Sequence, residues 1–165
     1  NIAWALNELD ESPFKNKIHR TGTGTDRLYA LNSMAKNVKD SFNHGAFHSL
    51  EAEKKIKALI EYWKLIAQHN AEAWEDMQRL KKQQLMKLCE LTGIIAWSLV
   101  APQIFLKGWA PESQTFNWEE IGKVIAFVGD DIDWDKEGEY GGYTGAVGGK
   151  RIAQELEAAL GYYRD

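Results

Sequence analysis

Cysteine and proline are both scarce in this chain of 165 residues, which contains one cysteine and three prolines. A single cysteine cannot form an internal disulfide, so covalent cross-links within the chain are excluded. This usage favours a reducing, cytoplasmic setting. The cysteine, Cys89, lies beside a strongly apolar stretch, and we interpret it as a small core residue rather than as a nucleophile.

The chain also lacks an apolar run long enough to cross a bilayer. One uncharged run extends from Leu91 to Leu106 and contains Pro102. A spanning helix needs about 20 apolar residues, so no membrane partner is predicted. The apolar residues of this run do not keep to one helical face, which predicts burial on every side. We therefore expect a buried central helix over about residues 85–102, ending near Pro102 because proline disrupts the preceding turn.

Positive charge is not in excess, because the formal net charge is −4. This value excludes a chain that is basic throughout but leaves room for a local basic patch. The contents of 44% hydrophobic and 27% charged residues argue against global disorder. A length of 165 residues fits one domain with its own core, so we assign residues 1–165 to a single helical domain. We recognise no signal peptide, and the start at Asn1 rather than at Met favours a fragment of a longer chain.

Apolar residues recur mostly at spacings of three and four, the period of an amphipathic helix. Helices are predicted over residues 2–9, 26–42, 49–80, 85–102, 118–128, and from 144 or 148 to 163. Thr25 is the expected cap of the second helix, and Asn117 is the expected cap of the fifth. The helix over 49–80 is long enough for a kink, and we expect it to form an antiparallel hairpin with the central helix. No strand is predicted, so the class is all-α, an irregular helical bundle around the central helix.

Acidic and histidine residues form no convincing metal or cofactor site. Asp131, Asp133 and Asp135 alternate as in a calcium loop. Lys136 and Gly142 stand where that loop needs glycine and glutamate, so a solvated acidic loop is the better interpretation. Nothing places two carboxylates across a cleft, and no hydrolase is predicted. No zinc pattern is formed by the four histidines, which are His19, His44, His48 and His69.

A second candidate lies near the start of the last predicted helix, where Lys150 and Arg151 follow Gly148 and Gly149. Glycines, backbone N–H groups and positive charge at a helix N-terminus are typical of an anion site. The pattern is not that of a nucleotide phosphate-binding loop, because Thr144 and Arg151 stand where that loop needs glycine and a hydroxyl residue. A plain glycine-rich turn leading into the helix is the favoured alternative.

The best nucleic-acid candidate is the basic segment 15–20 together with the Thr-Gly loop 21–25 that follows it. Basic side chains neutralise phosphates, and a Gly/Thr loop exposes backbone N–H and hydroxyl donors to them. Lys36 and Lys39 on the next predicted helix would extend the patch, whereas an ordinary solvated loop explains the pattern equally well. The predicted phosphate-contacting residues are Lys15, Lys17, His19, Arg20, Thr21, Thr23, Thr25, Arg27, Lys150 and Arg151.

The two ends of the chain read ALNELDESPFKNKIHRTGTGTDRLYALNSMAKNVKDSF (5–42) and IDWDKEGEYGGYTGAVGGKRIAQELEAAL (132–160). Together they resemble the C-terminal part of the DGQHR-domain proteins, the group that includes the DndB-like proteins of DNA phosphorothioate modification. The resemblance implies a bacterial or phage cytoplasmic protein that acts with DNA modification or restriction, as a DNA-binding regulator or accessory factor. The family's namesake segment, on a fold resembling the ParB nuclease-like domain, would precede Asn1. None of its residues is therefore assigned to this chain.

Two other functions stay open at this point. The predicted helix over 49–80 would display part of its surface in a helical protein–protein interaction module. Alternatively, the chain would be the non-catalytic, helical C-terminal part of a larger ParB-like α/β enzyme. The expected partners are DNA, together with a second copy of the chain or a protein of the modification system.

Overall fold

Helices form most of the chain in the computed structural model, which describes residues 1–20, 27–78, 87–135 and 137–164. The α-helices are α1 (Ile2–Glu8), α2 (Leu31–Ser41), α3 (Ala52–His69), α4 (Ala71–Trp74), α5 (Leu91–Leu106), α6 (Trp118–Gly129) and α7 (Gly145–Gly161). Two short 3-10 helices, η1 (Gly45–Phe47) and η2 (Glu75–Gln78), follow α2 and α4. The predominantly helical class is confirmed.

The strict all-α class is wrong, because two small strand pairs are present. Strand β1 (Ile18–His19) pairs in parallel with β2 (Tyr29–Ala30), and β3 (Trp109–Ala110) pairs antiparallel with β4 (Thr115–Phe116). Each strand has two residues, which is too short for an alternating apolar pattern to show in the sequence. Where it is described, the chain has no helix long and apolar enough to cross a membrane.

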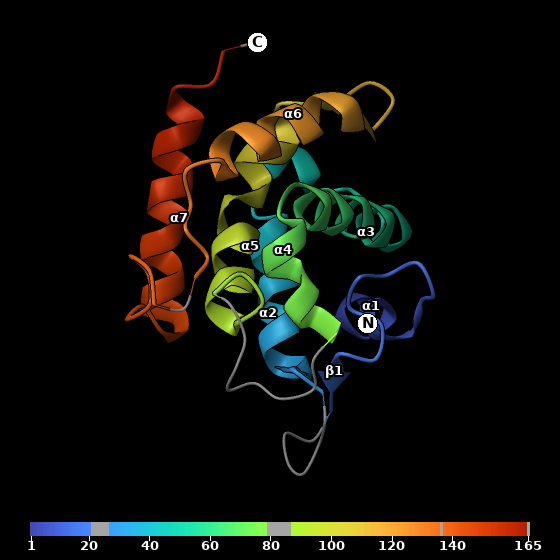
Figure 1. Cartoon of the computed structure of the whole chain (residues 1–165). Coiled ribbons are helices and arrows are strands. Elements are labelled where there is room, and N and C mark those ends of the chain that lie inside the picture. Colours follow the sequence, from blue (N-terminus) through green and yellow to red (C-terminus); the bar gives the residue numbers. More distant parts are fainter. Residues whose placement is uncertain (21–26, 79–86, 136, 165) are drawn as a thin grey trace.

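Helix α5 runs through the middle of the structure, with α7 on one side and α2 on the other (Figure 1). Its side chains are buried almost all round, as their apolar character predicted, and Ile94, Trp97 and Val100 are completely buried. The expected hairpin of α3 with α5 is wrong. Helix α3 packs mainly against α6, because the long sides of α5 are taken by α7 and α2.

The predicted limits of the central helix are both wrong. Helix α5 begins at Leu91 rather than near residue 85, and residues 85 and 86 lie outside the described chain. A Cβ atom on Gly93 would lie 2.3 Å from the carbonyl oxygen of Lys87, so the preceding turn folds back closely against the first helical turn. Only glycine permits this approach, and Leu91-Thr92-Gly93 was the missed signal for the start of the helix.

Pro102 lies inside α5, which continues to Leu106. A proline in a helix interior costs about 3 kcal/mol. Full burial of an Ile or Phe side chain contributes roughly 1.5–3 kcal/mol, and Ile104 and Phe105 are both completely buried. Phe105 stacks on Phe42 at a centroid distance of 5.4 Å and meets Tyr62 at 4.9 Å. Burial beyond the proline therefore offsets the lost backbone hydrogen bond.

The helix predicted over 49–80 is interrupted at Asn70, where a kink was expected. Helix α3 ends at His69, and α4 begins at Ala71. Asn70 has φ −133° and ψ 44° and separates α3 from α4. Its side-chain amide donates to the carbonyl oxygen of Ile66 at 2.9 Å and accepts from the indole N–H of Trp134 at 3.1 Å. One side chain thus closes the end of α3 and holds the loop before α7 against it.

Two other helix starts differ in how well local signals predict them. Helix α6 is capped as expected, because the Asn117 side-chain oxygen accepts from the backbone N–H of Glu120 at 3.1 Å. Helix α2 begins at Leu31 rather than at Asp26, because Tyr29 is held in strand β2. The Tyr29 hydroxyl donates to the carbonyl oxygen of Cys89 at 2.6 Å. The expected cap, Thr25, lies outside the described residues.

A buried lysine joins the turn before α5 to the segment that precedes α7. The Lys87 side chain is 2% exposed, and its Nζ lies 2.8 Å from a carboxylate oxygen of Glu90. The same ammonium donates to the carbonyl oxygen of Tyr143 at 2.6 Å. The backbone N–H of Lys87 donates to the carbonyl oxygen of Trp134 at 2.9 Å. Both ends of the segment 134–143 are therefore tied to one residue.

Candidate functional site

Two guanidinium groups of the basic segment gather on one aromatic ring. The Arg20 Cζ lies 4.1 Å from the ring centroid of Trp4, and the Arg27 Cζ lies 6.0 Å from it. Trp4 comes from α1, whereas the arginines flank the strand pair β1–β2. A cation over an indole face is stabilised by the ring quadrupole. The structure therefore brings Arg20 and Arg27 together at a platform that the sequence pattern did not reveal.

The other basic residues of this segment are already engaged or covered. Lys15 forms an ion pair with Asp10, and this hydrogen bond and charge hold the pKa of the Asp10 carboxyl below its usual range. Partial burial lowers the pKa of Lys17. The His19 side chain is only 6% exposed. These three side chains are therefore less available for contact with phosphates than the sequence suggested.

The remaining members of the predicted set lie in different places. Arg20 is exposed, and Arg27 donates from Nη1 to the carbonyl oxygen of Ile18 at 3.0 Å. Thr21, Thr23 and Thr25 lie outside the described residues. Among the described residues that were predicted around β1 and β2, Arg20 and Arg27 are the two that lie together at one ring, that of Trp4.

Lys150 and Arg151 lie within α7 rather than at its start. Helix α7 begins at Gly145, and Gly148 and Gly149 are buried inside it. A Cβ atom on Gly149 would lie 2.6 Å from Cγ2 of Ile95, so this glycine allows α7 to approach α5 closely. The plain-turn interpretation of the two glycines is therefore wrong, whereas phosphate contact by Lys150 and Arg151 stays a prediction. The Arg151 Cζ lies 5.8 Å from the ring centroid of Tyr143.

Two carboxylates of the acidic loop after α6 accept hydrogen bonds from backbone N–H groups of the same loop. Asp133 Oδ1 accepts from the backbone N–H of Asp135, and Asp135 Oδ1 accepts from that of Glu137, each at 2.9 Å. These short-range bonds hold the loop in turns. Among the residues that the structure describes, no group of three or more His, Cys, Asp or Glu side chains could hold a metal ion.

Cys89 is completely buried, as the sequence predicted. Burial, with a smaller contribution from Asp76, raises the pKa of its thiol to about 12. The thiol donates to the carbonyl oxygen of Ala73 at 3.3 Å. A nucleophile needs the opposite environment, one that exposes the thiolate and stabilises it. The structure therefore gives Cys89 a packing role.

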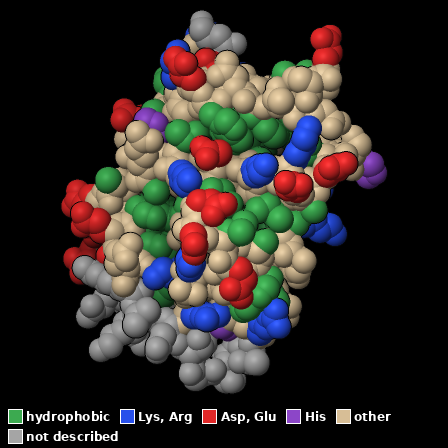
Figure 2. All heavy atoms as spheres, turned by 90° about the vertical axis from the view of Figure 1, so that its right-hand side faces the viewer, with side chains coloured by type: hydrophobic (Ala, Val, Ile, Leu, Met, Phe, Trp, Pro, Cys, Tyr) green, Lys and Arg blue, Asp and Glu red, His purple; other side chains and the backbone are tan. Residues whose placement is uncertain are grey.

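Charge on one face of the molecule is mixed in sign. Figure 2 shows lysine, arginine, aspartate and glutamate side chains interspersed on this face, with hydrophobic side chains between them. On α3, Lys57 lies 3.6 Å from Glu53, and Lys64 lies 3.9 Å from Glu61. Mixed charge of this kind provides no continuous basic track for a phosphate backbone.

A groove follows the line where α2 and α7 meet the partly exposed side of α5. Its volume is about 370 Å³, and we name it the α2–α7 groove. It is lined by Ser33, Lys36, Asn37 and Asp40 of α2, Leu91, Ile95 and Leu99 of α5, and Ala146 and Lys150 of α7. Ser33 and Leu91 also line a hollow of about 520 Å³ that His19 and Gly145 share.

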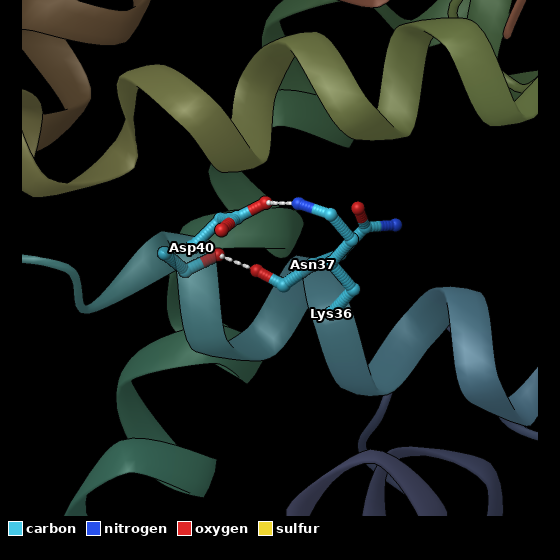
Figure 3. Close-up of polar contacts among 4 residues, drawn as sticks. Lys36, Asn37 and Asp40 are labelled. Atoms are coloured by element: carbon cyan, nitrogen blue, oxygen red, sulfur yellow. Dashed lines mark hydrogen bonds and ion pairs between the residues drawn. The ribbon is translucent and has the colours of Figure 1, made fainter. Parts of the chain in front are cut away.

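The polar groups along α2 are unevenly satisfied (Figure 3). Lys36 Nζ lies 2.8 Å from Asp40 Oδ2, and the Ser41 hydroxyl donates to the carbonyl oxygen of Asn37 at 2.7 Å. The Asn37 carboxamide points toward α5 and is joined to none of the other residues drawn. Its Nδ2 contacts the Met34 sulfur at 3.8 Å, which is a weak bond at best.

Comparison with known proteins found no matching family model, no matching curated protein and no matching solved structure.

Proposed function

We propose that this chain contacts DNA phosphates through Arg20 and Arg27 and serves as a DNA-binding regulator or accessory factor of a bacterial DNA modification or restriction system. The observation that carries the proposal is the gathering of both guanidinium groups on the ring of Trp4, at 4.1 and 6.0 Å. Guanidinium groups match the geometry of phosphate oxygens, and an aromatic face holds them in place without neutralising them.

The resemblance to the DGQHR-domain proteins supports the same function. Arg20 and Arg27 both fall within the first similar stretch, residues 5–42. The same proposal holds that this chain is the helical C-terminal part of a larger protein with a ParB-like domain. The genomic reading frame upstream of Asn1 tests this part, because an Asp-Gly-Gln-His-Arg segment there would establish the family.

The size of the cluster limits the affinity that it can provide. Two neutralised phosphates correspond to a slope of about −2 for log K against log salt. Fluorescence anisotropy of a labelled DNA duplex, measured over a salt series, reports this slope. The double change Arg20→Ala and Arg27→Ala should weaken binding at low salt and bring the slope close to zero.

Arg164 offers a matched control, because it is also an exposed arginine and, among the residues that the structure describes, bonds only to the carbonyl oxygens of Gly161 and Tyr163. Arg164→Ala should leave both the affinity and the slope unchanged. Equal losses in the two variants would mean that DNA responds to net charge alone, and unchanged binding in the double variant would remove the cluster from the proposal.

A second function, a helical protein–protein interaction module, is favoured by the α2–α7 groove. We move the contact surface from α3 to this groove, because exposed lysines of α3 are paired with neighbouring carboxylates on the same helix. A pull-down with the whole chain after nuclease treatment tests it. A specific protein that is retained by the wild type after nuclease treatment supports the module, and its loss on nuclease treatment contradicts it.

A further inference from the structure

Asn37 lines the α2–α7 groove with a carboxamide that makes one weak side-chain contact within the described chain. The residue is 4% exposed, and it lines the α2–α7 groove. Its Nδ2 contacts only the Met34 sulfur, at 3.8 Å, and its Oδ1 makes no hydrogen bond to any residue within the described ranges. The amide therefore offers both a donor and an acceptor to a molecule in the groove.

The floor of the groove is apolar. Leu91, Ile95 and Leu99 are spaced by four residues along α5, and they stay partly exposed although most of that helix is buried. Ala146 of α7 closes the far side without filling the space. A volume of about 370 Å³ accommodates a large apolar side chain, and apolar walls with a few convergent polar groups are typical of binding pockets.

The rim of the groove carries one unbalanced positive charge. Lys36 is paired with Asp40 at 2.8 Å. Lys150 is exposed on the α7 side, and it has no ion pair with any residue of the described part of the chain. An acidic group on the ligand would complement this charge and increase the rate of association.

We propose that the α2–α7 groove binds an extended peptide segment of a partner protein, with an apolar side chain next to an aspartate or glutamate. The apolar side chain lies on Leu91, Ile95 and Leu99, and the acidic one faces Lys150. Asn37 pairs with the backbone of one extended residue of the peptide, donating to that residue's carbonyl oxygen and accepting from its N–H.

This inference rests on the interaction-module proposal and names the partner's chemistry. A fatty-acid carboxylate fits the groove less well than a peptide, because it only accepts hydrogen bonds and would leave Asn37 Oδ1 without a donor. A residue of an extended peptide presents its own N–H and C=O on the same side of the chain, where one carboxamide can pair with both.

The test is selection of phage-displayed random peptides on the whole chain. The affinities of the enriched peptides are then measured by fluorescence anisotropy. Peptides that combine a large apolar residue with Asp or Glu are expected. Ala146→Trp fills the groove from an exposed position and should weaken binding by about tenfold or more. Val147→Trp is the matched control, because Val147 is the next residue of α7, is 71% exposed and does not line the groove.

Two further pairs test the polar contacts. Asn37→Ala should weaken binding by about 5- to 20-fold, whereas Asn32→Ala, on the exposed side of α2, should not. Lys150→Glu should abolish the preference for acidic peptides, and the exposed Lys107→Glu should preserve it. Circular dichroism of each variant checks that it folds.

The inference is overturned if no peptide is enriched, if the enriched peptides are basic, or if they bind Ala146→Trp as tightly as the wild type. Failure of the broader interaction proposal looks different. A protein that the nuclease-treated pull-down retains equally with the wild type and with Ala146→Trp would keep the module but place its contact surface outside this groove.

Discussion

The phenolic hydroxyl of Tyr62 on α3 donates a hydrogen bond of 2.6 Å to the backbone carbonyl oxygen of Trp97 on α5. Tyr62 is completely buried, and this burial raises the pKa of its phenol well above the usual value. The hydroxyl therefore stays protonated and acts as a donor at neutral pH. This bond adds to the ring contacts of Tyr62 with Trp97 and Phe105, which also join α3 to α5.

Removing that hydroxyl should destabilise the fold. Tyr62→Phe should lower the free energy of unfolding by about 1–2 kcal/mol, because a buried carbonyl oxygen loses a partner. Tyr162 is 77% exposed, so Tyr162→Phe should change the same quantity by less than about 0.5 kcal/mol. Urea unfolding followed by tryptophan fluorescence measures both variants, and equal effects would show that the bond to Trp97 contributes nothing.

The close contact of α7 with α5 at Gly149 should not tolerate a side chain. A Cβ atom there would lie 2.6 Å from Ile95 Cγ2 and 3.0 Å from the carbonyl oxygen of Thr92. Gly149→Ala should therefore lower the free energy of unfolding by about 1–3 kcal/mol. Gly161, the last residue of the same helix, has open space around its Cβ position. Gly161→Ala should be neutral or slightly stabilising, and a stabilising Gly149→Ala would contradict the tight packing.

Alkaline pH should destabilise the protein through Cys89. Its pKa is raised from 9.0 to about 12, so the unfolded chain loses the thiol proton above pH 9 while the folded chain keeps it. The contribution of the Cys89 thiol to the free energy of unfolding should thus be fully present below about pH 9. It should be lost, by up to about 1.4 kcal/mol per pH unit, as the pH rises toward 12.

Comparison with Cys89→Ala isolates this effect, because the packing loss of the variant does not depend on pH. Urea unfolding at pH 8, 9 and 10 should show a steeper decline for the wild type than for the variant. Burial alone raises the pKa of Tyr62, which therefore contributes equally to both curves, whereas the pKa of Tyr29 is raised by burial and also by the charge of Cys89, so part of the Tyr29 contribution is removed together with the thiol. Parallel curves for the two proteins would mean that the folded thiol titrates normally.

Features that depend on neighbours in sequence were predicted well. Asn117 caps α6 because its side chain reaches a backbone N–H three residues ahead, and the residue type alone suggests this. Asn70 lies on the apolar stripe of the helix predicted over 49–80, and it hydrogen-bonds to Ile66 four residues earlier and to Trp134. Short-range hydrogen bonding of this kind leaves a clear trace in the order of residues.

Features that depend on distant neighbours were predicted poorly. Pro102 is a strong local stop signal, but burial of Phe105 against Phe42 and Tyr62 carries α5 past it. Gly149 was interpreted as part of an anion site or turn, because its contact with Ile95 depends on the crossing of two helices. Both errors arise because tertiary packing outweighs local preference.

The candidate sites follow the same division. The basic residues around β1 can be recognised from the sequence. Lys15 and Asp10, which form an ion pair, are also only five residues apart in the sequence. The Trp4 platform for Arg20 and the groove around Asn37 were not visible, because each joins segments whose contact is set only by the fold. The sequence pattern therefore identifies the basic residues, but it does not show which of them are exposed and which are paired or buried.

Lys87 has a consequence for how the polypeptide can be shortened. Its ammonium is satisfied by Glu90 and by the carbonyl oxygen of Tyr143, and its own N–H reaches Trp134. A truncation before Trp134 would remove the carbonyl oxygen of Tyr143. The buried ammonium of Lys87, just before α5, would then keep only Glu90 as a partner. The interior therefore needs residues 134–161 in order to assemble, and any shortened form of the protein should retain them.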